Sequence, residues 1–67
     1  MANQELTDDI LREPEAAVVA RESARTFRQR RYDGTGPRYL KIGARALYRR
    51  SAVLEWMYSH ERASGAA

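Results

Sequence analysis

The apolar positions in the first half of the chain are spaced for two short helices. A helix is predicted to begin near Glu13-Pro14, because proline is tolerated in a first turn, and its small apolar face consists of Ala16, Ala17, Val19 and Ala20. Ser23 is a good N-cap for a second helix that runs to about Asp33, and Gly34 suits the left-handed position that ends it. The two helices are therefore expected to be joined by a turn of about two to four residues.

From Arg38 the apolar period shortens to two, which is the period of a strand. Leu40 and Ile42 fall on one face of this strand. Residues 43–45 are the expected turn of a hairpin, and residues 46–49 return as its second strand. Inward residues of that return strand are expected to pack in the core.

A third helix follows the hairpin. Ser51 is its expected N-cap, because a serine hydroxyl can accept a hydrogen bond from a free backbone N–H. Val53, Trp56 and Met57 have the i, i+3, i+4 spacing of a buried stripe. The predicted fold class is therefore α+β, in the order helix, helix, strand, strand, helix.

The 67 residues are enough for one small domain, which we place over residues 10–60. Residues 1–9 are polar and acidic and predict a flexible arm, although Ile10 and Leu11 are expected to pack against the core where the chain enters it. Residues 61–67 predict a flexible tail. A chain of this length buries only about 60% of its unfolded surface, so the domain is expected to be marginally stable alone.

Charge is strongly segregated along the chain. The net charge is −4 over residues 1–22, +8 over residues 23–50 and −1 over residues 51–67, which leaves +3 for the whole sequence. The positive charge is thus confined to the second predicted helix and the hairpin. A localised basic surface of this kind favours a polyanionic partner.

Composition argues against several other classes of protein. There are no cysteines, and one histidine, His60, provides almost no metal-binding capacity. No nucleophile accompanies His60 and Glu61, and no glycine-rich phosphate loop is present, so we predict neither an enzyme nor a cofactor or metal site. The sequence has no apolar run near the roughly 18 residues of a membrane span and no signal-peptide pattern at its start. The expectation is a cytoplasmic, nucleoid-associated protein with no membrane partner.

Several short motifs occur together in an order that is informative. They are Glu15-Ala16-Ala17, Ser23-x-Arg25-Thr26, Gly34-Thr35-Gly36-Pro37, Lys41-Ile42-Gly43, Tyr48-Arg49-Arg50-Ser51 and Trp56. With these motifs the chain resembles the small winged helix-turn-helix proteins of the excisionase and AlpA type, which are related to the MerR DNA-binding domain. The resemblance extends from about Leu11 to Trp56. Arg30 stands where these proteins commonly have tryptophan, and Leu47 stands where a polar residue is usual.

The resemblance implies a winged helix-turn-helix that binds double-stranded DNA. It also implies a role in excising a prophage or integrative element, in which the protein bends DNA and biases an integrase or other recombinase toward excision. A transcriptional regulator of the AlpA or MerR type is the alternative within this group. A basic module that holds an acidic protein partner is an alternative from a different class.

Candidate DNA contacts follow from the early turns of the second helix and from the wing. Arginine can grip guanine with two donors and glutamine can read adenine, and early residues of a recognition helix are the ones that reach base edges. The basic side chains of the wing are expected to contact phosphate, with one arginine at the tip of the hairpin. The expected DNA-binding residues are Ser23, Arg25, Thr26, Arg28, Gln29, Arg31, Lys41, Arg45 and Arg49.

Two neighbouring arginines admit different roles. One of Arg30 and Arg31 is expected to lie over the core where tryptophan is usual, and the other to contact phosphate. Tyr48 and Trp56 fall at inward positions, so we expect them to pack in the core rather than to stack on single-stranded bases.

Self-association is expected to occur on DNA. One short helix and one wing make too small a footprint to select a genomic site, so we expect cooperative, head-to-tail binding of monomers to repeats, with Leu47 among the contacts.

Overall fold

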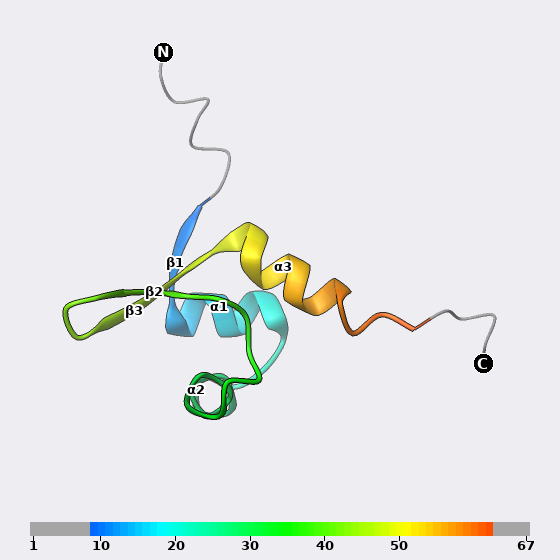
Figure 1. Cartoon of the computed structure of the whole chain (residues 1–67), viewed down its shortest axis with the longest axis horizontal. Coiled ribbons are helices and arrows are strands. Elements are labelled where there is room, and N and C mark those ends of the chain that lie inside the picture. The colour runs from blue at the N-terminus through cyan, green and yellow to red at the C-terminus, as the bar shows by residue number, and fades with distance from the viewer. Residues whose placement is uncertain (1–8, 63–67) are drawn as a thin grey trace, which may run out of the picture.

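Three helices and one three-stranded antiparallel sheet make up the computed structural model, which describes residues 9–62 (Figure 1). Of the expected acidic arm, residues 1–8 lie outside the described residues, and so do residues 63–67 of the expected tail. The elements in chain order are β1 (Ile10–Arg12), α1 (Glu13–Ala20), α2 (Ala24–Asp33), β2 (Leu40–Ile42), β3 (Arg45–Arg49) and α3 (Arg50–Tyr58).

The two helices of the first half begin and end where the local signals predicted. The Ser23 hydroxyl accepts a hydrogen bond from the backbone N–H of Thr26 at 3.0 Å, which caps α2. Gly34 ends that helix with a φ of 75°. Residues 21–23 join α1 to α2, and Arg21 ends α1 with a φ of 64°, a conformation that side chains other than glycine rarely adopt.

The hairpin of β2 and β3 is confirmed, but its turn is shorter than expected. Ile42 pairs with Arg45, so only Gly43 and Ala44 connect the strands. Gly43 has a φ of 60°, and a glycine at the first position suits a two-residue hairpin turn. Arg45 is therefore the first residue of β3 and not a residue of the turn itself.

A strand that the sequence analysis missed precedes α1. The expected order of helix, helix, strand, strand, helix is wrong at its start, because β1 pairs with β3 and the sheet order is β1-β3-β2. Three residues are too few to show a period of two. The strand exists because β3 offers its other edge, where Leu11 lies opposite Tyr48.

The start of the third helix also differs from the prediction. Arg50 is the first residue of α3 and Arg49 is its N-cap, so Ser51 lies inside the first turn and is not the cap. The backbone N–H of Arg50 donates to the carbonyl oxygen of Asp9 at 2.8 Å. A long-range partner thus satisfies this first N–H, and α3 follows β3 directly.

The core is small and lies where α1 packs against β1, β3, α2 and α3, at the centre of the molecule (Figure 1). Its largest buried side chains are Tyr48, Phe27 and Val53, with Trp56 partly buried against them. The centre of the Phe27 ring lies 5.1 Å from the centre of the Tyr48 ring and 6.0 Å from that of the Trp56 ring. The predicted inward positions of Tyr48, Val53 and Trp56 are therefore confirmed.

Candidate nucleic-acid interface

One side of α2 is an exposed polar stripe. Arg25, Arg28, Gln29 and Tyr32 are all exposed, and their i, i+3, i+4, i+7 spacing places them along one face of the helix. Phe27, which is 1% exposed, packs into the core on the other side. We call these four exposed residues the α2 stripe. Tyr32, 67% exposed, was missed by the sequence analysis, although its spacing from Arg25 could have indicated it.

The two hydroxyl residues at the start of α2 are engaged with one another. Besides accepting from Thr26, the Ser23 hydroxyl donates to the Thr26 hydroxyl at 3.0 Å. Both side chains are exposed. This pair holds the N-terminus of the helix from which the α2 stripe starts.

The hairpin carries its basic residues on both faces. Lys41 lies opposite Ala46, on the sheet face that also holds Tyr48 and packs against the helices. Because side chains alternate along a strand, Arg45 and Arg49 lie on the outer face. Arg45 follows the turn directly and Lys41 lies one residue before Ile42, which precedes it, and the turn projects beyond the helices (Figure 1).

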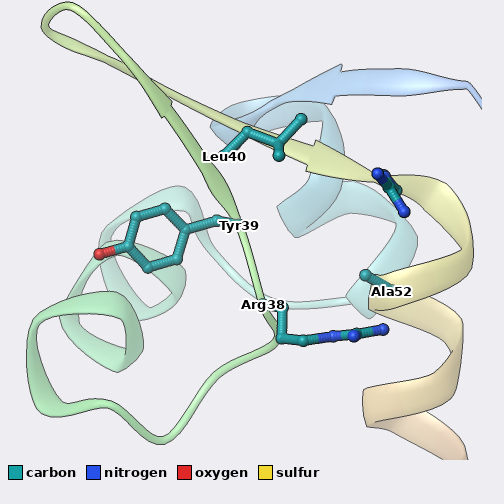
Figure 2. Close-up of a pocket in the computed structure, with 5 residues that line it drawn as sticks. Arg38, Tyr39, Leu40 and Ala52 are labelled. Carbon is teal, nitrogen blue, oxygen red and sulfur yellow. The ribbon is translucent and has the colours of Figure 1, made fainter.

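Arg49 lies at the opposite end of β3 from the turn. It lines a shallow hollow together with Arg38, Tyr39, Leu40 and Ala52. In Figure 2 the Arg38 side chain extends toward α3 and Ala52, whereas Tyr39 turns the other way, toward α2. Arg49 is therefore separated from the basic residues at the tip, although the sequence analysis grouped all three.

Arg31 belongs to an internal network and not to the α2 stripe. Its Nε donates to Glu13 Oε2 at 2.6 Å, and the Tyr48 hydroxyl donates to the same oxygen at 2.8 Å. The side chains of Arg31 and Glu13 are only 13% and 15% exposed. Arg31, expected to contact DNA, instead connects the end of α2 to the start of α1 and to β3.

Protonation in this network follows from its contacts. The hydrogen bond from Arg31 lowers the pKa of Glu13 below its ordinary value of 4.5, although partial burial opposes this. Burial and the hydrogen bond to Glu13 raise the pKa of Tyr48 above its ordinary value of 10.0. Tyr48 therefore keeps its proton and donates to an ionised Glu13 at neutral pH.

Arg30 occupies the place over the core that was predicted for one of the two arginines. Its guanidinium lies 5.3 Å from the centre of the Trp56 ring, and its Nε and Nη2 donate to the Glu22 carboxylate at 2.7–3.0 Å. The Glu22 hydrogen bond raises the pKa of Arg30. Arg30 is thus an ion-paired arginine whose guanidinium lies over the Trp56 ring.

Ion pairing divides the basic residues into two groups. Arg30, Arg31, Arg38 and Arg50 pair with Glu22, Glu13, Glu55 and Asp9, respectively. In contrast, no ion pair within residues 9–62 involves Arg25, Arg28, Lys41, Arg45 or Arg49, and all of these are exposed. Arg12, Arg21 and Arg62 are also exposed and outside these ion pairs, so five of the eight unpaired basic residues in this part of the chain lie on the α2 stripe and the hairpin.

In the described part of the chain, no helix is both long and apolar enough to span a bilayer, and no three potential metal ligands lie together. Comparison with known proteins finds no family model that matches the chain and no curated protein that is significantly similar to it.

Proposed function

We propose that this protein is a winged helix-turn-helix that binds double-stranded DNA with sequence preference. The observation that supports this most directly is that four acids of the fold pair with other arginines, whereas five of the eight unpaired basic residues among residues 9–62 lie on the α2 stripe and the hairpin. In the proposal α2 enters the major groove and the hairpin lies on the adjacent backbone.

The α2 stripe has the chemistry needed to read bases. Arg25 and Arg28 each present paired donors that match guanine O6 and N7, and Gln29 presents the donor and acceptor that match adenine. Ser23 and Thr26 stand at the N-terminus of α2, where free N–H groups and the helix dipole favour a phosphate.

The hairpin has the chemistry needed to contact phosphates. A minor groove is bordered by a phosphate strand on each side, and the hairpin has Lys41 on one face and Arg45 on the other, next to its turn. These two residues can therefore contact both borders when the turn enters the groove. Arg49 would reach a phosphate farther along the backbone.

The biological role we propose is that of an excisionase-like factor. Its support is the resemblance of the motifs between Leu11 and Trp56, together with the helix, turn, helix and hairpin order. Such a factor would act on DNA in the cytoplasm, bend it and favour excision by an integrase or other recombinase. A transcriptional regulator of the AlpA or MerR type remains the second candidate, because the same stripe and hairpin suit it.

We expect the affinity for DNA to depend strongly on salt. We also expect that substituting a phosphate-contacting arginine and substituting a base-reading arginine will change binding in different ways. About five phosphate contacts predict a slope of log K against log salt of roughly −4 to −5.

Arg45→Ala should weaken binding to specific and to random duplexes about equally and make that slope shallower by about one, because it removes a phosphate contact. Arg28→Ala should cost about 1–3 kcal/mol on the preferred site and relax sequence preference. Fluorescence anisotropy on both duplexes over a salt series measures all three.

The matched control is Arg38→Ala, which removes an exposed arginine that pairs with Glu55 on α3, away from the α2 stripe. It should change the salt slope less than Arg45→Ala does. A flat salt response of the unmodified protein contradicts the proposed function. A change of sequence preference in Arg45→Ala shows that the hairpin reads bases or groove width.

The mode of assembly separates the two proposed roles. Ile10, Leu40 and Leu47 lie on the outer sheet face, where we place the contact between neighbouring copies. An excisionase-like factor is expected to be a monomer without DNA and to bind direct repeats cooperatively, and Leu47→Asp should remove the cooperativity but leave binding to one repeat. Sedimentation and shift assays on one and on several repeats test this. A stable dimer that prefers an inverted repeat supports the regulator instead.

A further inference from the structure

Gln29 is held by a neighbouring acid. Its Nε2 donates to Asp33 Oδ1 at 3.1 Å, between residues one helical turn apart on α2. A carboxylate has only acceptor atoms at neutral pH, so the amide must turn its NH₂ group, and not its carbonyl oxygen, toward Asp33. The pair lies along the same side of α2 as Arg25, in a hollow that Thr26 and Arg30 also line.

Helix stability does not account for Asp33. It is the last residue of α2, where the helix dipole disfavours a negative charge. Asp33 is exposed and takes part in no ion pair among residues 9–62. Its one hydrogen-bonded side-chain partner in this part of the chain is Gln29, the glutamine of the α2 stripe.

We propose that Asp33 is a positioning residue that makes Gln29 favour adenine over guanine at one position of the DNA site. This inference rests on the proposed function and assigns one source of its specificity. Asp33 does not need to touch the DNA, because it acts through the orientation of the Gln29 amide.

The held orientation of the Gln29 amide matches adenine better than guanine. Adenine presents an acceptor at N7 and a donor at N6 in the major groove, and guanine presents acceptors at both N7 and O6. With one N–H directed to Asp33, the amide offers one further N–H and its carbonyl oxygen, which match adenine. The same carbonyl oxygen opposes guanine O6. A free amide can rotate and direct both hydrogens at guanine, so release from Asp33 removes the discrimination.

The test is a base-substitution series on the preferred duplex with wild type, Asp33→Asn and Gln29→Ala. Asparagine keeps the size of Asp33 but can also donate, so it no longer forces one orientation. We expect wild type to favour adenine over guanine about tenfold at one position, and Asp33→Asn to lower this ratio to about twofold. Glu61→Gln, which removes one exposed negative charge after α3, is the control for a general gain in affinity and should leave the ratio unchanged.

A second measurement reads the same contact without DNA. The chain has two glutamines, Gln4 and Gln29, so the side-chain amide signals in a nitrogen-proton correlation spectrum can be assigned. The Gln29 amide signals should shift in Asp33→Asn and stay in place in Glu61→Gln. Unchanged signals overturn the contact itself.

Three outcomes of the base-substitution series test the roles of Asp33 and Gln29 and the proposed function. An unchanged adenine-to-guanine ratio in Asp33→Asn, with a changed ratio in Gln29→Ala, overturns the role of Asp33 and keeps Gln29 as a reader. Equal adenine-to-guanine ratios in wild type and all variants overturn the roles of both Asp33 and Gln29, while salt-dependent binding still supports the proposed function. Absence of any duplex binding by wild type overturns the proposed function and this inference together.

Discussion

Phe27→Ala is expected to remove a large part of the protein's free energy of unfolding. Phe27 is 1% exposed and its ring contacts those of Tyr48 and Trp56, so its removal leaves a cavity where α2, β3 and α3 meet. Truncation of a buried phenylalanine costs about 3–5 kcal/mol. A domain of this length has a total stability of roughly 3–10 kcal/mol, so the substitution removes about a third of it or more. Urea denaturation followed by far-ultraviolet circular dichroism measures the change.

The control for this prediction is another aromatic residue on a helix. Tyr58 on α3 is 65% exposed, and Tyr58→Ala should change the free energy of unfolding by less than about 0.5 kcal/mol. Phe27→Leu should fall between the two, because it restores part of the lost volume. A Phe27→Ala protein as stable as Tyr58→Ala would show that the aromatic cluster is not the centre of the core.

Glu13→Gln is expected to destabilise the protein by about 2–4 kcal/mol at pH 7. The substitution leaves the guanidinium of Arg31 largely buried without its charged partner and weakens the hydrogen bond from Tyr48. Glu55→Gln removes a carboxylate from the pair with Arg38, whose N–O distance is 3.0 Å against 2.6 Å for Arg31 and Glu13, but the side chains of Glu55 and Arg38 are 68% and 81% exposed. An exposed pair contributes about 0–1 kcal/mol, so Glu55→Gln is the matched control.

The effect of Glu13→Gln should depend on pH with a defined sign. The pKa of Glu13 is lower in the folded protein than its ordinary value of 4.5. The stabilisation is therefore fully present above about pH 4.5 and is lost as the pH falls through the lower, folded pKa. The stability difference between wild type and Glu13→Gln should shrink over that range in urea titrations at pH 7, 4.5 and 3. A difference that does not change with pH contradicts an ionised Glu13 in the network.

The sequence by itself determined the elements that local chemistry controls. Ser23 and Gly34 fixed the ends of α2 through a side-chain cap and a left-handed backbone position, and Gly43 placed the hairpin turn. The buried stripe of Val53, Trp56 and Met57 and the inward position of Tyr48 were predicted correctly, whereas Leu40 and Ile42, the apolar pair of the hairpin, lie on the outer face of the sheet, where Ile42 is 52% exposed. Interactions between residues a few positions apart are readable because the spacing of the side chains already specifies the geometry.

The tertiary structure decided the features that depend on residues far apart in the sequence. β1 exists because β3 provides an edge for it, and α3 begins at Arg50 because the carbonyl of Asp9 meets its N–H. For the candidate site, the sequence placed Arg25, Arg28 and Gln29 on an early face of α2 but could not separate them from Arg31. Only the fold brings Glu13 within reach of Arg31, 18 residues later, and so removes that arginine from the exposed set. The sequence shows which residues are basic and which of them share a helix face. Ion pairing across the fold decides which of these basic residues remain available to a partner.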